Sequence, residues 1–409
     1  MEEQKIKEVT WQQTKIRNAE EYQNKIFDSL NNQSYVSKKD KRITLTNGDE
    51  YTEFISCSYL GLDQDVRILT AASRNLERAG FSFSSARTRM KYSGLDELEN
   101  LLNQVFMAST VCFSTVHLVH LGLIPLLGSG EIPGFKIRSA PHFILDKYVH
   151  ASIQINRGLM TQFGNVSLVD FNEVDSLLKI IKSTSSEGNT PILICDSVGS
   201  MGSTANIKLL VELIKQYDGY LYLDDAHGMS TFGTHGNGYA MMVLEDVLDD
   251  RIILTTSLSK AFGTYGGLAI VKNPKAAEFI KKFCSTYIFS GSLATPLIEA
   301  SIVSAKIHLS EEIYQLQDAV SDNLLLFDTI ISPNIRIINR NSAVSIRGWY
   351  IGGEFEAITA GEYLKEHGIL ATVATYPSTP KHQSLIRFGI CSNHTEAEII
   401  KLCTLINLK

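Results

Sequence analysis

The chain has 409 residues, 44% of them hydrophobic and 20% charged, which is typical of a water-soluble globular protein with room for two domains. Its formal net charge of -6 excludes the basic footprint of a nucleic-acid-binding protein. The six cysteines include no Cys-x-x-Cys pair, which argues against a metal site or a disulfide framework and favours a reducing compartment. The polar N-terminus, Met1–Lys5, has no apolar signal core, so we expect a cytoplasmic protein.

Residues 1–40 have the pattern of a charged, amphipathic helical arm. Isoleucine and valine residues between positions 6 and 26 form an imperfect apolar stripe, so the arm is expected to pack on the body of the protein or on a partner subunit. After the arm, alternating apolar residues flank the dipeptide Asn47-Gly48, which favours a tight turn. This pattern predicts a β-hairpin over residues 43–55.

The most apolar stretch of the chain runs from Val111 to Leu127. It contains His117, His120 and Pro125, and these residues make it too polar for a clear bilayer span. We therefore expect a buried helix here and no membrane span.

Between residues 60 and 300, helical patterns alternate with short apolar runs that are typical of buried strands. Such runs with helices between them predict a mainly parallel sheet covered on both faces. After residue 300, a long helix leads into a smaller α+β region. We predict an α/β fold with three parts: an arm and hairpin (1–55), a large domain (56–300) and a small C-terminal domain (301–409). The predicted strands are 143–146, 191–196, 220–224, 251–255 and 268–271.

A lysine in a hydroxyl-rich segment is the first candidate for chemistry. Lys260 follows Ser257 and Ser259, and upstream of it Asp224-Asp225-Ala226-His227 ends an apolar, strand-like run. A lysine that forms a Schiff base with pyridoxal phosphate (PLP) needs hydroxyls for the phosphate and a carboxylate at the pyridine nitrogen. A lone lysine near serines is usually a solvated surface residue, but the two segments together predict a PLP enzyme.

Two adjacent carboxylates compete for the role at the ring nitrogen. Asp224 ends the apolar run, which places it at the carboxyl edge of the sheet, where open α/β sheets carry their chemistry. Asp225 fits equally well on spacing, and the pattern does not separate the two. Either aspartate would also serve as a helix N-cap. His227 favours the cofactor role, because it would reach the cofactor's phenolic oxygen or the substrate's carboxylate region.

Three further positions in the sequence are candidates for the site. His150 comes after residues 143–146, and its imidazole would stack on the cofactor ring, although a lone histidine is more often structural. Ser114 and Thr115 open a helical run, which suits a phosphate at a helix N-terminus but equally a plain N-cap. Arg387 lies in a short apolar strand and needs an anionic partner, either a substrate carboxylate or an internal salt bridge.

Taken in order, these motifs resemble the α-oxoamine synthase family of fold-type I PLP enzymes, which includes 8-amino-7-oxononanoate synthase, 2-amino-3-ketobutyrate CoA ligase and serine palmitoyltransferase. The resemblance covers residues 56–400. The most specific part of the resemblance is the motif Asp224–Gly228 together with the downstream lysine motif Ser257–Gly263. The matching segments are Tyr59–Leu62, His150–Ser152, Asp196–Gly202, Asp224–Gly228, Gly233–Gly238, Ser257–Gly263 and Phe289–Ser292, with Arg387 seven residues before His394.

The resemblance implies a role for each core residue of the site. Lys260 would form the internal aldimine, Asp224 would pair with the pyridine nitrogen and His150 would stack on the ring. It also implies a large cofactor domain with a small C-terminal domain, and catalysis by condensation of an α-amino acid with an acyl thioester.

The resemblance further implies residues that hold the rest of the cofactor and the substrate. Ser200 and His227 would contact the cofactor oxygen, and Arg387 would hold the amino-acid carboxylate. Ser290 and Ser292 resemble residues that reach the phosphate across a dimer interface, so a homodimer is expected.

The sequence departs from the family pattern in four places. Cys57-Ser58 replace Asn-Asp, and Ser114-Thr115-Val116 replace a Ser-Gly-aromatic phosphate cradle. Residues 84–89, with Arg87 and Arg89, replace a glycine-rich segment, and residues 128–142 form an apparent extra loop. By analogy, the last two would lie near the thioester entrance, which predicts an unusual acyl donor on coenzyme A or a carrier protein.

The sequence favours a PLP-dependent acyltransferase that condenses a small amino acid with an acyl thioester and releases carbon dioxide. The sequence leaves two alternatives open. One is an aminotransferase or lyase of the same fold, because these enzymes also need Lys260 and Asp224. The other is a non-catalytic relative that serves as a structural or regulatory subunit.

Overall fold

A computed structural model describes residues 11–84 and 86–409 of the chain and divides it into two compact units. Unit 1 comprises the described residues up to Ser56 together with Asp322–Lys409, and unit 2 comprises Cys57–Ser321. Unit 1 therefore joins the predicted arm and hairpin to most of the predicted C-terminal domain, while residues 301–321 belong to unit 2. The helix α13 (Glu312–Ile330) carries the chain from unit 2 into unit 1.

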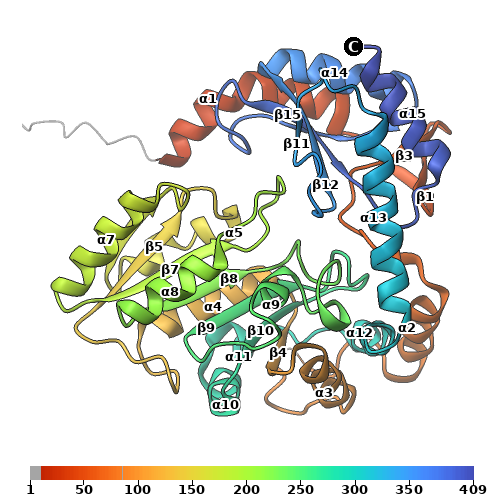
Figure 1. Cartoon of the computed structure of the whole chain (residues 1–409). Helices are drawn as coiled ribbons and strands as arrows, with labels where there is room; N and C mark the ends of the chain where they lie inside the picture. The colour runs from red at the N-terminus through yellow and green to blue at the C-terminus, as the bar shows by residue number, and fades with distance from the viewer. Residues whose placement is uncertain (1–10, 85) are drawn as a thin grey trace, which may run out of the picture. The chain divides into compact units, whose positions relative to one another are not determined.

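Unit 2 is built on a seven-stranded sheet in the order β4-β10-β9-β8-β7-β5-β6 (Figure 1). The strands from β9 to β6 pair in parallel, and β10 pairs antiparallel with both of its neighbours. This confirms the predicted mainly parallel sheet. The strands are β4 (Ser109–Phe113), β5 (Pro141–Asp146), β6 (Asn165–Val169), β7 (Thr190–Asp196), β8 (Tyr220–Asp224), β9 (Ile252–Ser257) and β10 (Gly267–Val271).

Helices cover both faces of this sheet, because the strand residues are apolar on both sides. Leu221 and Leu223 of β8 belong to one core, and Tyr220 and Tyr222 belong to the other. The first core includes α3 (Gly94–Phe106), α7 (Val174–Ser186), α8 (Ile207–Gln216), α9 (Tyr239–Val243) and α12 (Thr295–His308). The second includes α4 (Val116–Gly128), α5 (Ala151–Gln154), α6 (Arg157–Met160), α10 (Pro274–Phe283) and α11 (Ser285–Phe289). Unit 2 also contains α2 (Val66–Ala79), which packs on α12, and the short 3-10 helices η2 (Leu62–Gln64) and η3 (Thr234–Gly236).

The prediction of a single helix over residues 111–127 is wrong in its first part. Val111–Phe113 end β4 and pair with β10, and the helix α4 begins only at Val116. The β-branched and aromatic residues of this run fit a buried strand, and Thr115 then caps the helix by accepting a hydrogen bond from the N–H of Leu118 at 3.2 Å.

Unit 1 contains two four-stranded sheets, in the orders β1-β2-β3-β13 and β11-β12-β15-β14. Asn47-Gly48 turn the chain between β2 and β3, with Gly48 at φ 91°, which confirms the predicted hairpin. The strands are β1 (Tyr35–Lys39), β2 (Arg42–Leu45), β3 (Glu50–Glu53), β11 (Ile337–Ile338), β12 (Ile346–Gly352), β13 (Ile369–Leu370), β14 (Thr372–Ala374) and β15 (Ser384–Gly389). The helices are α1 (Trp11–Ile26), the π-helix η1 (Phe27–Asn31), α14 (Glu354–Glu366) and α15 (Glu396–Asn407).

The predicted arm is helical for only part of its length. Helical structure ends at Asn31, and Tyr35–Lys39 form the strand β1, which pairs antiparallel with β2. Charged residues in this segment suggested a helix, but pairing with β2 satisfies its backbone as a strand. The first ten residues, which include Ile6 and Val9 of the apolar stripe, lie outside the described residues.

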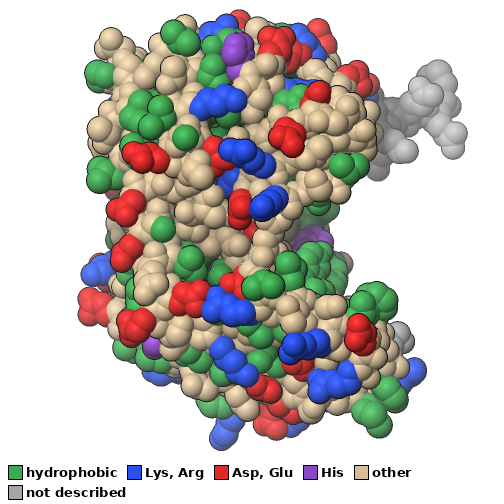
Figure 2. All heavy atoms as spheres, turned by 90° about the vertical axis from the view of Figure 1, so that its right-hand side faces the viewer, with side chains coloured by type: hydrophobic (Ala, Val, Ile, Leu, Met, Phe, Trp, Pro, Cys, Tyr) green, Lys and Arg blue, Asp and Glu red, His purple; other side chains and the backbone are tan. Residues whose placement is uncertain are grey.

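The surface carries charges of both signs. Figure 2 shows one face of the molecule, on which Lys and Arg side chains are interspersed with Asp and Glu side chains. Within the described residues, no helix combines the length and the apolar character that crossing a bilayer requires.

A buried ion pair of unit 1 ties α13 to β12. Arg347 is fully buried, and its Nε and Nη2 atoms donate to the two carboxylate oxygens of Asp328 at 2.8 and 2.6 Å. Its remaining donors reach backbone carbonyls, including that of Val344 at 2.8 Å. Removing one partner of such a pair leaves an uncompensated buried charge.

We expect Asp328→Asn to lower the free energy of unfolding by about 3–5 kcal/mol, because it leaves the buried guanidinium without its counter-charge. Urea denaturation of the full chain measures the change. The matched control is Glu278→Gln, which breaks the exposed pair with Lys282 and should cost no more than about 1 kcal/mol. Equal costs for the two variants would contradict the assignment.

Candidate functional site at the carboxyl edge of the unit 2 sheet

Three aspartates end neighbouring strands at one edge of the unit 2 sheet. Asp146, Asp196 and Asp224 are the last residues of β5, β7 and β8, and Asp196 and Asp224 lie directly opposite each other in the strand register. The carboxyl ends of parallel strands meet at one edge, which is where open α/β sheets bind ligands. The candidate site is therefore built at this edge.

The alternation of side chains along β8 places Asp224 and Asp225, the two candidates for the ring nitrogen, on opposite faces of the sheet. Tyr222 belongs to the core that contains α4, so Asp224, two residues further, projects toward the same face. There, its Oδ2 atom lies 3.1 Å from Nε2 of the buried His120 of α4. Its Oδ1 atom accepts the backbone N–H of Ala226 at 3.0 Å.

Asp225 projects to the other face and has a packing role there. One of its oxygens accepts the hydroxyl of Ser197, and the other accepts the N–H of Ala240 at the start of α9, at 3.1 Å. A Cβ atom at Gly228 or Gly238 would lie 2.1 Å from this carboxyl group, so both glycines are required by the close packing. Burial raises the pKa of Asp225 to about 7.

Asp224 is held in its ionised form by its neighbours. Burial alone would raise the pKa of this carboxyl group, but the hydrogen bond and the electrostatic effect of His120, and then the positive charge of Lys260, lower it below its ordinary value. Lys260 lies in the turn between β9 and β10, where Gly263 adopts φ 82° and a Cβ atom would lie 2.5 Å from the side chain of Leu62. This tight turn fixes the position of the lysine segment.

His150 and Asp196 are joined at the same edge. The backbone N–H of His150 donates to Oδ2 of Asp196 at 3.1 Å, and Nδ1 of His150 lies 2.7 Å from the hydroxyl of Ser152. The side chain of His150 is exposed, so a ligand can reach its ring. Burial and then the charge of Asp224 raise the pKa of Asp196 well above its ordinary value.

His227 and Ser200 lie in the segments that follow β8 and β7. Nδ1 of the buried His227 is 2.9 Å from the hydroxyl of Tyr59, which belongs to the Tyr-Leu-Gly-Leu motif of residues 59–62. Ser200 is half-buried in a turn that a bridge between Val198 and Thr204 closes. The sequence analysis did not anticipate the contact between Tyr59 and His227.

The N-terminus of α4 brings together several predicted phosphate residues. A Cβ atom at Gly267 would lie 2.3 Å from the backbone nitrogen of Val116, so this glycine lets the helix end approach β10 closely. The hydroxyl of Ser114 donates to the carbonyl of Gly291 at 3.2 Å, which places the segment of Ser290 and Ser292 next to Ser114 in the same chain. The hydroxyls of Ser290 and Ser292 donate to the carbonyls of Thr286 and Leu293.

The serines beside Lys260 are bonded to their own turn. The hydroxyl of Ser257 accepts the N–H of Ser259 at 3.1 Å, and the hydroxyl of Ser259 accepts the N–H of Gly266 at 3.4 Å. Both oxygens act as acceptors in these bonds, so their hydroxyl hydrogens remain usable for an anion.

Arg387 is described within unit 1. It is buried in the middle of β15, where Gly348 of β12 and Thr372 of β14 lie opposite it. The predicted buried strand around this arginine is confirmed.

The loop over residues 128–142 does not lie at the edge of the sheet that carries the candidate site. Within residues 128–142, the carbonyl of Lys136 accepts the hydroxyl of Tyr220 at 3.0 Å and the N–H of Arg138 donates to Thr190 Oγ1 at 2.9 Å. Tyr220 and Thr190 begin β8 and β7, so this loop lies at the opposite edge from Asp224. Analogy with the family fixes the loop's place in the chain order and not the edge of the sheet that it covers.

Arg87, in the replaced segment of residues 84–89, lies in the interior of unit 2. It is buried, stacks 4.0 Å from the ring centre of Tyr287 and donates to the carbonyls of Cys112 and Gly291 at 2.7 and 3.3 Å. It therefore binds the end of β4 to the segment around Gly291, and its guanidinium is not a surface charge for an acyl donor.

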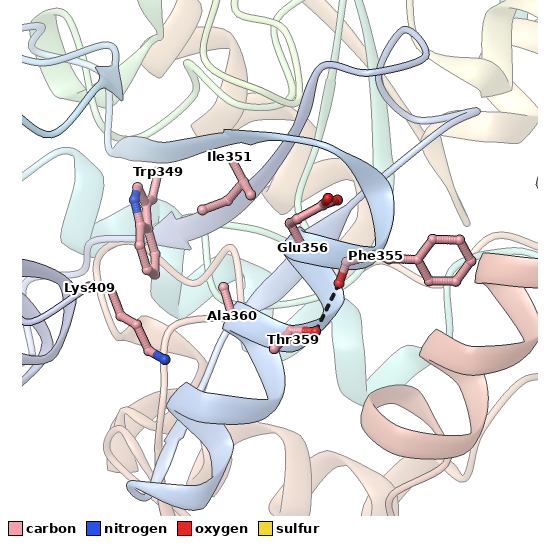
Figure 3. A pocket seen from close by; sticks show the side chains of 7 residues that line it. All are labelled: Trp349, Ile351, Phe355, Glu356, Thr359, Ala360 and Lys409. Carbon is pink, nitrogen blue, oxygen red and sulfur yellow. Dashed lines mark hydrogen bonds between the residues drawn. The ribbon is translucent and has the colours of Figure 1, made fainter.

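A separate hollow of about 410 Å³ lies in unit 1 between β12 and α14 (Figure 3). Trp349 and Ile351 of β12 and Phe355 of α14 give it an apolar wall, and Thr359 donates to the carbonyl of Phe355 at 3.1 Å. None of the predicted site residues lines it. The complete lining is Trp349, Ile351, Phe355, Glu356, Thr359, Ala360 and Lys409.

The sequence of the chain matches the family Aminotransferase class I and II over residues 58–406. It is 26% identical over 363 residues to an 8-amino-7-oxononanoate synthase from Marinomonas sp. (strain MWYL1), covering 88% of this chain and 86% of that protein. It is 27% identical over 379 residues to a serine palmitoyltransferase from Sphingobacterium spiritivorum, covering 89% and 87%.

Solved structures of similar fold carry the same names. A serine palmitoyltransferase from S. paucimobilis with a bound PLP–myriocin aldimine superposes with a TM-score of 0.82 at 22% identity, covering 97% of each chain. An 8-amino-7-oxononanoate synthase from Francisella tularensis superposes with a TM-score of 0.71 at 19% identity, covering 88% of this chain and 97% of that one. These likenesses confirm the predicted fold type I. The chain belongs to the class I and II aminotransferase family, whose cofactor is PLP, and its relatives are α-oxoamine synthases.

Proposed function

We propose that this protein is a PLP-dependent acyltransferase that condenses an α-amino acid with an acyl thioester and releases carbon dioxide, giving an α-amino ketone. The observation that carries the proposal is the ionised, buried Asp224 at the sheet edge, with the charge of Lys260 acting on it. His150 stands at the same edge through its bond to Asp196. This is the set of groups that the chemistry of the cofactor requires.

The residues present fit the cofactor at each of its functional groups. Asp224 offers a carboxylate to the ring nitrogen, and Lys260 offers an amine to the aldehyde. The N-terminus of α4, with Ser114 and Thr115, and the hydroxyls of Ser257 and Ser259 suit a phosphate. When bound, the cofactor draws off the negative charge that forms on the α-carbon of the amino acid.

The chain's own residues are assigned to binding and to proton transfer. Lys260 takes the proton from the α-carbon and returns one after the carboxylate has left as carbon dioxide. His150 orients the reacting carboxylate or the thioester carbonyl, and Ser200 and His227 contact the cofactor's phenolic oxygen. Arg387 holds the amino-acid carboxylate. The carbon nucleophile attacks the thioester carbonyl, and the thiolate leaves.

The substrates follow from the same assignment. Arg387 favours an α-amino acid with a free carboxylate and a small side chain, such as glycine, alanine or serine. The acyl group comes as a thioester of coenzyme A or of a carrier protein, in line with relatives named 8-amino-7-oxononanoate synthase and serine palmitoyltransferase. A cytoplasmic location and a homodimer, with Ser290 and Ser292 facing the partner's phosphate, belong to the same proposal.

An aminotransferase or lyase of the same fold is the second candidate, because the family takes its name from aminotransferases. Such an enzyme needs the same lysine and aspartate. A non-catalytic relative is disfavoured, since the chain retains Lys260, Asp224, His150 and His227 together.

Replacing Lys260 tests the cofactor assignment directly. Lys260→Ala should abolish the visible absorption band of the reconstituted protein and the linkage that borohydride reduces, because no amine remains for the aldehyde. Absorption spectra and mass spectrometry after reduction measure both. Lys275, in α10, provides the control, since Lys275→Ala should keep the band. A wild-type protein that shows no band with PLP would overturn the proposed function.

The two aspartates should differ sharply in their effect on activity. Asp224→Asn should lower kcat/KM by about 100- to 1000-fold, because it removes the charge that stabilises the protonated ring nitrogen. Asp225→Asn should keep kcat/KM within about threefold and cost at most about 2 kcal/mol of stability, because it alters only a packing contact. Steady-state kinetics and urea denaturation separate the two effects. Loss of activity in the Asp225 variant alone would reverse the assignment.

The class of reaction is decided by the co-substrate. With an amino acid and an acyl thioester, the enzyme should release carbon dioxide and free thiol in equal amounts. With the same amino acid and a 2-oxo acid, it should transfer no amino group. Carbon dioxide capture, thiol titration and amino-acid analysis measure the three products. Sustained amino-group exchange without a thioester would favour the aminotransferase.

A further inference from the structure

We propose that His120 is a positioning residue that fixes the Asp224 carboxylate toward the cofactor's ring nitrogen and keeps that nitrogen protonated. This inference rests on the proposed function, because it assigns a second residue to the same end of the cofactor. In the sequence, His120 stands out only as a polar residue in an apolar stretch, and no motif of the family resemblance includes it.

The geometry places the imidazole between two polar groups of β8. Nε2 of His120 lies 3.1 Å from Oδ2 of Asp224, and Nδ1 lies 2.9 Å from the phenolic oxygen of Tyr222. His120 and Tyr222 are fully buried, and Asp224 is 5% exposed. In such surroundings each polar atom depends on the partners that the fold supplies.

The proton positions follow from the chemistry of the three groups. A carboxylate only accepts hydrogen bonds, so Nε2 must carry the hydrogen that points at Asp224. The other ring nitrogen, Nδ1, lies within hydrogen-bond distance of the phenolic oxygen of Tyr222. The tyrosine and the carboxylate therefore hold the imidazole ring from both nitrogens, in the way that outer partners orient metal-bound histidines.

The two oxygens of Asp224 are served by separate elements. Oδ1 accepts the N–H of Ala226 in the turn after β8, and Oδ2 accepts Nε2–H of His120 from α4. With one donor on each side, the carboxylate cannot rotate without losing a bond, and each oxygen keeps a lone pair for the ring nitrogen. Without His120, the buried oxygen would regain a partner most cheaply by taking a proton.

The position of His120 in α4 gives this contact a wider consequence. His120 stands five residues after Thr115, the N-cap, which corresponds to about 7.5 Å along the helix axis. The same helix therefore offers its N-terminus to the phosphate and its second turn to the carboxylate at the ring nitrogen. A single rigid element sets the distance between the two ends of the cofactor site.

The test uses the full-length protein reconstituted with PLP that carries ¹⁵N in its ring, because the ¹⁵N chemical shift reports whether that nitrogen is protonated. In the wild type, the resonance should stand at the protonated position. His120→Leu should move it toward the unprotonated position and weaken cofactor binding about 10- to 100-fold, since a hydrogen bond to a charged group is lost. His120→Gln, whose amide nitrogen replaces Nε2, should restore most of both.

The matched control is His308, a fully buried histidine of α12 bonded to Ser304 and Ser230 on the other face of the sheet. His308→Leu should cost stability but leave the ¹⁵N shift and the cofactor affinity unchanged. If His120→Leu does not fold, Tyr222→Phe decides, since it removes only the hydroxyl that holds Nδ1 of His120. A shift and weaker binding in that variant support the inference.

Two outcomes overturn the inference while leaving the proposed function intact. The first is a folded His120→Leu protein that keeps the wild-type ¹⁵N shift and affinity, or the same result for Tyr222→Phe if the leucine variant does not fold. The second is a His120→Gln protein that is as impaired as the leucine variant. A wild-type protein that binds no PLP overturns the proposed function itself, and this inference with it. Thermal unfolding of every variant separates lost binding from lost folding.

Discussion

The candidate site of unit 2 is built around one buried carboxylate and the groups that favour its ionised form. Asp224 is buried at the end of β8, where desolvation favours its protonated form. Two donors and the charge of Lys260 reverse that preference. These groups come from α4, from the turn after β8 and from the turn after β9. The fold must hold all three elements in register for the carboxylate to retain its charge.

The N-terminus of α4 packs closely on β10 because the residue that it meets there is a glycine. Gly267 of β10 has no side chain where the backbone of Val116 passes, and Thr115 satisfies a backbone donor of the first turn. Below that turn, Val119, Leu123 and other apolar residues are buried in the second core of unit 2. Packing therefore fixes the helix, and the polar His120 is carried into the core on an otherwise apolar element.

Much of this arrangement could be predicted from the sequence, because strand patterns and strand ends are local features. The parallel sheet, the hairpin at Asn47-Gly48 and the aspartate at the end of β8 all follow from the pattern of residues. The separation of Asp224 from Asp225 could not be predicted from spacing, but it follows from alternation once β8 is known to end at Asp224. His120 was not identified, because its partner is 104 positions away and only the packing of α4 on β8 brings them together.

The position of a departure in the chain did not predict where it lies in the structure. The loop over residues 128–142 lies at the amino ends of β7 and β8, so it does not border the candidate site. Arg87 is enclosed against Tyr287 and serves packing. Two short departures lie at the site itself. Val116 is the first residue of α4, whose N-terminus packs closely against Gly267 of β10. Ser58 precedes Tyr59, whose hydroxyl contacts His227. If the substrate specificity differs from that of the synthases, we expect the difference to arise at Ser58 and Val116, because a side chain at either position alters the space around the proposed cofactor site.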